Sequence, residues 1–165
     1  AATTRAYRKA VDEAWAGRAF EVAAARDACC SLAVAVTSVG GLVVAVAHRG
    51  AASLELPVAG RALTADGVDA FHGGPLDDVL RREGRTHLLI AGIGVEGPVH
   101  STLRSANDRG YECLLIADAT APLTTDLVEA SAKTVTMSGG IFGAVGTTEA
   151  TVAALHQIST HLARS

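Results

Sequence analysis

The stretch THLLIAGIGVEGPVHSTLRSANDRGYECLLIADA, residues 86–119, decides the fold class of this chain. It begins with an apolar run at 86–93 and ends with another at 111–119, and both have the length and branched side chains of strands buried on two faces. Between them, a glycine-rich turn leads into a helix-like segment at 97–109 that Gly110 ends. A strand, a helix and a second strand in this order predict a βαβ unit with parallel strands.

The same alternation extends to both sides of this unit. Residues 42–48, LVVAVAH, are a further buried-strand pattern. Residues 19–25 leave strand and helix open, and the valines of 26–41 leave open a hairpin with the strand at 42–48. Further strands are expected near 60–64 and at 134–138, and helices at 3–17, 26–41, 74–84, 124–133 and 147–164. This order predicts a three-layer α/β/α fold with a mainly parallel sheet of about five or six strands, in a single domain over residues 1–165.

The composition narrows the classes of protein that fit. The net charge is -3 and there is no basic block, which argues against a nucleic-acid partner or an anionic membrane surface. No apolar run reaches the ~18 residues of a membrane span, and the first residues lack the pattern of a secretory signal. Three cysteines, two of them adjacent, make a poor disulfide framework. We therefore expect a cytoplasmic protein with neither a nucleic-acid nor a membrane partner.

Polar residues that follow the expected strands are the candidates for a site, because ligands of parallel α/β sheets bind beyond the carboxyl ends of the strands. Glu96 and His100 flank Pro98 in the glycine-rich turn, and His72 lies in an earlier loop. Carboxylates and imidazoles can act as acid and base, so His72, Glu96 and His100 are the candidate catalytic residues. The residues expected to line a substrate pocket are Ala24, Arg26, Asp27, His48, Phe71, Val95, Gly97 and Pro98.

Each of these polar residues also has a purely structural explanation. A carboxylate at Glu96 is favourable at a helix N-terminus in any case. His72 can cap the following helix, and His100 can face solvent or a subunit neighbour. His48 can be an ordinary histidine at the end of a strand.

The stretch 86–119, together with 70–84 and the closing TTEATVAAL at 147–155, resembles the isochorismatase-like cysteine hydrolases. The resemblance covers residues 41–155 well and the first 40 residues loosely. It implies the α/β fold, a small-molecule ligand and a homo-oligomer. The residues that fit the family pattern around the turn are Gly92, Ile93, Val99, Ser101, Thr102, Arg104, Ala106, Gly110, Tyr111, Asp118 and Ala119.

The resemblance also implies a catalytic triad of a cysteine nucleophile, an aspartate base and a lysine that lowers the thiol pKa. The cysteine position falls on Pro98, and the threonine expected before it is Val95. Aligning residues 19–27 with the family's first strand places Ala24 at the aspartate position. The family lysine belongs just before Ala70, and the chain has no lysine other than Lys9 and Lys133. We therefore expect the Asp/Lys/Cys triad to be absent.

Three functions remain open on this pattern. The first is a repurposed enzyme with a small-molecule pocket, acting in secondary metabolism as a cyclase, isomerase or lyase through acid–base or positional catalysis. The second is a non-catalytic pseudoenzyme or binding scaffold. The third is a hydrolase with a relocated nucleophile, which Cys29 or Cys30 would have to supply.

We expect neither a metal nor a cofactor, and a homodimer or larger homo-oligomer. Some members of the family hold a metal through Asp and His after the second strand, but HRGAASLELP, residues 48–57, has one histidine and no aspartate. The apolar helix at 26–39 offers a surface to a second copy.

Overall fold

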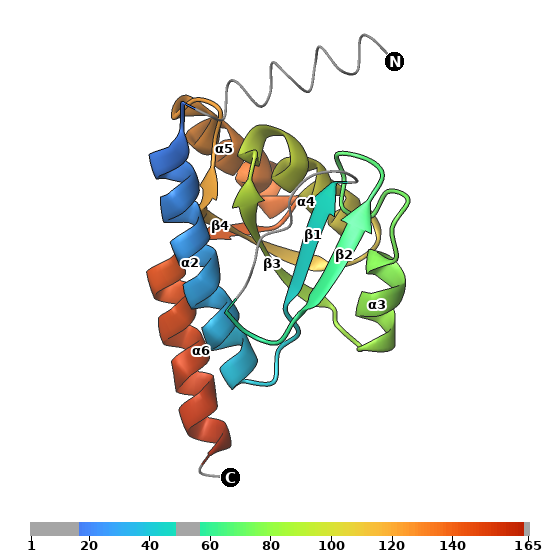
Figure 1. Cartoon of the computed structure of the whole chain (residues 1–165), viewed down its shortest axis with the longest axis vertical. Coiled ribbons are helices and arrows are strands. Elements are labelled where there is room, and N and C mark those ends of the chain that lie inside the picture. The colour runs from blue at the N-terminus through green and yellow to red at the C-terminus, as the bar shows by residue number, and fades with distance from the viewer. Residues whose placement is uncertain (1–16, 49–56, 164–165) are drawn as a thin grey trace.

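The computed structural model describes residues 17–48 and 57–163, and Figure 1 shows their arrangement. The helix predicted at 3–17 lies almost entirely outside the described residues. α2 (Ala19–Ser38) leads into β1 (Val44–His48), which pairs in parallel with β2 (Arg61–Ala65). Gly40 has a positive φ of 73° just after α2, so this predicted helix ends where the glycine pair indicates.

The second half of the chain builds a three-stranded sheet. Its strands are β3 (His87–Ile93), β4 (Glu112–Ala121) and β5 (Ala144–Gly146), with β4 in the middle and both pairings parallel. The prediction of a parallel α/β fold is therefore confirmed. The described strands form a pair and a triplet rather than one sheet, because β1 and β3 do not hydrogen-bond to each other.

Helices cover both faces of β4. α2 and α6 (Thr148–Leu162) lie side by side on one face (Figure 1), and α4 (His100–Asp108) and α5 (Asp126–Gly140) pack against the strands from the other. The short α3 (Leu76–Arg82) follows β2.

Alternate residues of β4 belong to two different apolar clusters, one on each face of the strand. Cys113 and Leu115 belong to the core beneath α4 and α5, whereas Leu114 and Ile116 pack in the cluster beneath α2. A strand with apolar residues on both faces and helices on each side gives the predicted three-layer arrangement.

The structure decides one segment that the sequence left open and corrects one predicted strand. Residues 19–25 are the first turns of α2 and form no strand. The predicted strand at 134–138 is wrong: residues 134–136 are helical in α5, where the hydroxyls of Thr134 and Thr136 donate to the carbonyl oxygens of Ala130 and Ala132, at 2.9 and 3.1 Å. These bonds accommodate β-branched residues in a helix. The chain then kinks at Met137 and Ser138, whose backbone angles are not helical.

The strand β5 was not predicted because its sequence is short and rich in glycine. Gly143 approaches β4 so closely that a Cβ there would lie 2.3 Å from the carbonyl oxygen of Cys113. Thr147 then caps α6 as predicted, because its hydroxyl oxygen accepts the N–H of Ala150 at 3.3 Å. Across residues 17–48 and 57–163, the helices are too short or too polar to cross a membrane.

Candidate active site at the carboxyl end of β3

A sharp turn joins β3 to the helix that follows it. Gly94 adopts the left-handed conformation, with φ 83° and ψ 63°, and the chain then enters a five-residue π-helical turn, η1 (Val95–Val99), that continues into α4. The Gly94 N–H donates to the carbonyl oxygen of Ala121 at 2.8 Å, which holds the turn against the end of β4. The turn therefore lies at the carboxyl ends of two neighbouring strands, as the sequence predicted.

Pro98 lies inside η1 and leaves few backbone donors in the turn. The N–H groups of Gly97 and Val99 both donate to the carbonyl oxygen of Gly94, at 3.1 and 3.2 Å, and proline has no N–H. The helix predicted from residue 97 is confirmed, but its first turn is π-helical. A proline is accommodated there because the wider turn needs no N–H from residue 98.

Glu96 faces the loop after β4. Its Oε2 accepts a hydrogen bond from the N–H of Leu123 at 3.3 Å. The carbonyl oxygen of Leu123 in turn accepts a hydrogen bond from Nη1 of Arg18 at 2.7 Å. Arg18 also pairs with Glu21 at 2.9 Å, while its buried Nε has no partner among the described residues. Sequence reasoning missed Arg18, since a single arginine before a helix carries no motif.

His100 is half-buried at the start of α4. Its Nδ1 accepts a hydrogen bond from Nε of Arg104 at 3.1 Å. Burial first, and the nearby Arg104 charge second, lower the pKa of His100 below its usual value. A neutral ring that accepts at Nδ1 carries its proton on Nε2 and can donate from there.

His72 lies in the exposed loop between β2 and α3. Its ring packs on Gly67, where a Cβ would lie 2.8 Å from the ring Cδ2, and its carbonyl oxygen accepts the N–H of Asp66 at 2.9 Å. In the described part of the chain, the His72 side chain makes no hydrogen bond to Glu96 or His100. Glu96 and His100 thus lie in the same turn, each with its own hydrogen-bond partner, and His72 lies in a separate loop.

Phe71 belongs to the core and anchors the same loop. Its ring stacks on Tyr111 with 5.8 Å between centroids, and the guanidinium of Arg109 lies 4.8 Å from its centroid. Tyr111 in turn donates to Oδ1 of Asp77 at 2.7 Å. Phe71 is 6 % exposed, so it supports the loop from beneath.

The remaining predicted pocket residues separate into two groups. Val95, Gly97 and Pro98 belong to the turn η1; Val95 is fully buried, and a Cβ added at Gly97 would meet nothing within 4 Å. His48 is the half-buried last residue of β1.

The second group contains Ala24, Arg26 and Asp27, which lie on the exposed side of α2. Their placement after a first strand was wrong, because residues 19–25 are helical. The alignment that put Ala24 at the aspartate position assumed a strand there, whereas Ala24 lies in a helix.

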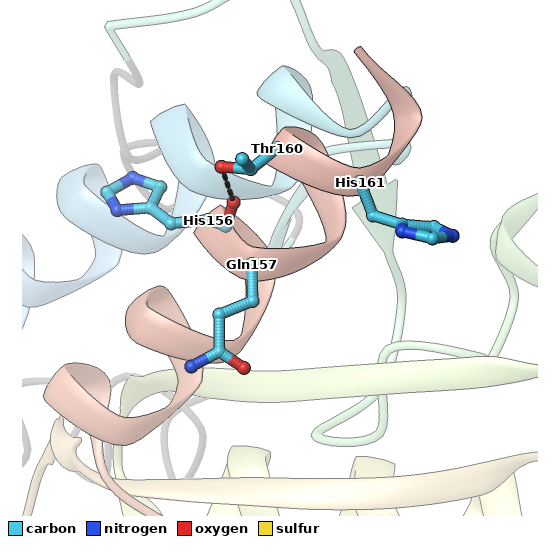
Figure 2. Close-up of a pocket in the computed structure, with 4 residues that line it drawn as sticks. All are labelled: His156, Gln157, Thr160 and His161. Carbon is cyan, nitrogen blue, oxygen red and sulfur yellow. Dashed lines mark hydrogen bonds between the residues drawn. The ribbon is translucent and has the colours of Figure 1, made fainter. Parts of the chain in front are cut away.

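A hollow of about 360 Å³ lies elsewhere, on the C-terminal half of α6 (Figure 2). It is lined by His156, Gln157, Thr160 and His161, and the two imidazoles point away from each other (Figure 2). The Thr160 hydroxyl donates to the His156 carbonyl oxygen at 2.9 Å. Within residues 17–48 and 57–163, no three His, Cys, Asp or Glu residues are grouped closely enough to hold a metal ion.

Comparisons with known proteins agree with this architecture. The sequence model of the Isochorismatase domain matches residues 51–150. A cysteine hydrolase from Pseudomonas syringae pv. phaseolicola superposes with a TM-score of 0.76 at 17% identity, over 84% of this chain and 83% of that one. A nicotinamidase from Bacillus subtilis gives 0.65 at 19% identity, over 74% and 84%. An N-carbamoylsarcosine amidase from Thermoplasma acidophilum gives 0.65 at 20% identity, over 78% and 85%.

The parallel strands, the helices on both faces and the turn after β3 define an isochorismatase-like α/β protein. This chain belongs to the isochorismatase family, because the family's domain model matches more than half of it.

Proposed function

We propose that this chain is a small-molecule enzyme of the isochorismatase family that works without a cysteine nucleophile, through acid–base catalysis at the turn after β3. One observation carries the proposal. Pro98 occupies the turn position at which the resemblance to the cysteine hydrolases places the nucleophile, and it is flanked there by Glu96 and His100. A proline side chain has no group that can attack a carbonyl.

The thiols of the chain do not offer a replacement nucleophile. Burial raises the pKa of Cys29 and of Cys113 to about 11, so both are protonated at neutral pH, and the thiolate is the reactive form. Cys113 is also at the start of β4, whereas the turn lies at the end of the strands. Cys30 is inside α2, about three turns from its start and about two turns from its end.

The position at which the resemblance places the family lysine, just before Ala70, does not hold a lysine. The residue directly before Ala70 is Asp69, whose Oδ1 accepts the N–H of Phe71 at 2.9 Å. A carboxylate at this place would raise the pKa of a neighbouring thiol rather than lower it. The triad of the cysteine hydrolases is therefore absent in our proposal.

Glu96 can accept a proton from a substrate, and His100 can donate one. They are four residues apart, which places them on the same side of a helical turn. Nε2–H of His100 can donate to a ligand oxygen, and Oε1 of Glu96 can accept a proton while Oε2 stays bound to Leu123. Such a pair suits isomerisation, elimination or cyclisation, in which a proton is moved and no acyl-enzyme forms. A substrate from secondary metabolism stays a prediction.

A second function, a binding scaffold without catalysis, has its own support. Both side chains already have partners in the protein, Leu123 for Glu96 and Arg104 for His100. His72, the third predicted catalytic residue, contacts neither of them in the described part of the chain. A protein that only binds a ligand would not need these three side chains to act together on a substrate.

The test is a turnover screen, followed by NMR, of a panel of small carboxylic acids, vinyl ethers and amides. The amides include nicotinamide and N-carbamoylsarcosine. We expect no hydrolysis of amides and no covalent adduct by mass spectrometry. A substrate that is isomerised, eliminated or cyclised should lose ~10²–10⁴-fold in turnover with Glu96→Gln or His100→Asn.

Glu149→Gln and His156→Asn on α6 are the matched controls and should leave the rate unchanged. Binding without turnover, measured by calorimetry, would favour the scaffold. An acyl adduct on any of the three cysteines would overturn the proposal.

A further inference from the structure

Arg18 occupies a place that does not favour an arginine. It is the N-cap residue of α2 and makes no capping hydrogen bond with its side chain, whereas Ser, Thr, Asp and Asn are preferred there. Its positive charge lies at the end of the helix that is itself positive. The side chain is only 19 % exposed, and its buried Nε has no partner among the described residues, which costs free energy. The stability of α2 therefore does not explain an arginine at this position.

The contacts of Arg18 lead instead to the loop after β4. Its Nη1 donates to the carbonyl oxygen of Leu123 at 2.7 Å, across 105 positions of the chain. A hydrogen bond from a charged guanidinium is shorter and stronger than one between neutral groups. Glu21, in the first turn of α2, accepts Nη2 at 2.9 Å and so helps to fix the direction of the guanidinium plane.

Leu123 connects this arginine to the candidate base. It lies between β4 and α5, in a segment that is neither helix nor strand. Its N–H donates to Oε2 of Glu96 at 3.3 Å, so Glu96 and Arg18 engage both backbone polar groups of Leu123. A carboxylate that is held by one oxygen presents the other in a defined direction. The orientation of Glu96 thus depends on where Arg18 holds Leu123.

We propose that Arg18 is a positioning residue for the base Glu96, which it holds through Leu123. This inference rests on the proposed function and adds to it a residue that has no contact with the reacting atoms. Loss of Arg18 should leave ligand binding intact and misorient the carboxylate. A displacement of a catalytic group by about 1 Å can lower turnover by ~10²-fold.

Arg85 provides a matched control within the same chain. Its Nε is also buried without a partner in the described part of the chain, and its Nη2 also donates to a backbone carbonyl oxygen, that of Gly40, at 3.2 Å. Arg85 precedes β3, however, and the turn with Glu96 follows the other end of that strand. Loss of Arg85 should therefore affect stability without affecting the orientation of Glu96.

The first test needs no substrate. Amide hydrogen exchange, followed by NMR, measures how firmly the N–H of Leu123 is held. Arg18→Met keeps most of the side chain without its donors, and exchange at Leu123 should become about 10-fold faster or more. Arg18→Lys retains a charged donor and should restore most of the protection, and Arg85→Met should leave it unchanged. Exchange at Leu123 that is the same in Arg18→Met as in the unaltered protein would overturn the proposal.

The second test is kinetic and uses the substrate that the panel of small carboxylic acids, vinyl ethers and amides yields. Arg18→Met should lower kcat by about 10- to 100-fold and leave KM within about two-fold, because only the orientation of the base changes. Arg18→Lys should recover most of the loss, and Arg85→Met should turn over like the unaltered protein. A raised KM with an unaltered kcat would place Arg18 in contact with the substrate and would contradict a positioning role.

The same variants separate this inference from the proposed function. If Glu96→Gln lowers turnover while Arg18→Met does not, the base is confirmed and this inference alone fails. An equal loss in Arg18→Met and Arg85→Met would reduce the role of Arg18 to general stability and would also overturn it. If Glu96→Gln retains full turnover, the proposed function fails and this inference fails with it.

Discussion

Gly94 and Pro98 constrain each other in the turn after β3. A Cβ at position 94 would lie 2.8 Å from Cδ of Pro98, and the backbone there has a φ of 83°. A proline in the π-helical turn is thus compatible only with a glycine four residues earlier. The shape of the turn depends on this pair of residues.

Gly94→Ala should destabilise the protein by about 1–2 kcal/mol from the left-handed backbone alone, and by more because of the contact with Pro98. Urea unfolding followed by circular dichroism measures the change. Gly97→Ala is the matched control in the same turn, since a Cβ there meets nothing within 4 Å and the φ is not positive. Equal losses in the two variants would show that position 94 is not special.

Pro98→Cys should not create a cysteine hydrolase. An unassisted thiol has a pKa near ~8.5, so only a few per cent is thiolate at neutral pH. No lysine lies between Lys9 and Lys133 to lower that pKa. The rate of alkylation by iodoacetamide as a function of pH gives the pKa of the new thiol, and mass spectrometry detects an acyl adduct. A thiol that is already ionised at pH 7, or a rapid adduct with an amide substrate, would show that a base and a cation are in place.

His100 should make stability depend on pH in the mildly acidic range. Its pKa is lowered in the folded protein by burial and by Arg104, whereas the unfolded chain has the ordinary value of ~6.5. As the pH falls through that value, the unfolded chain binds the proton first, so the free energy of unfolding decreases. When the pH is lowered from 7.5 to 5, the melting temperature of His100→Gln should therefore decrease less than that of the unaltered protein. The exposed His156→Gln is the control and should follow the unaltered protein.

Tyr111→Phe should destabilise the protein by about 1 kcal/mol through the loss of one hydrogen bond to Asp77. Tyr111 is 5 % exposed, and its hydroxyl donates to Oδ1 of Asp77 at 2.7 Å. The same bond, followed by Arg81, lowers the pKa of Asp77, so the variant should move that pKa back towards its usual value. Urea unfolding measures the first effect and NMR titration of the carboxyl carbon measures the second. An unchanged Asp77 pKa would contradict the assigned cause.

Local apolar patterns were sufficient to predict most of the elements. The strands at 42–48, 86–93 and 111–119 and the helix capped by Thr147 were found from runs of side chains and their stop signals. A strand that is buried on both faces needs apolar residues at every position, so it is visible as a continuous run of neighbouring residues. The turn around Pro98 was also located in this way, since it directly follows one of these runs.

The segments that the sequence left open or did not predict are those that a distant contact decides. The alanines at 19–25 suit a helix or a strand, and packing beside β4 and α6 selects the helix. The strand at β5 exists because Gly143 can approach Cys113, about thirty residues away along the chain, and glycine alone is small enough to do so.

By itself, then, the sequence determined the α/β class, the place of the turn and the proline within it, because these follow from neighbouring residues. Only the tertiary structure decided which polar groups meet there. The hydrogen bonds that hold Glu96 to Leu123 and Leu123 to Arg18 join residues far apart in the chain. No periodicity along the sequence reports such contacts, since they arise from how the strands and helices pack.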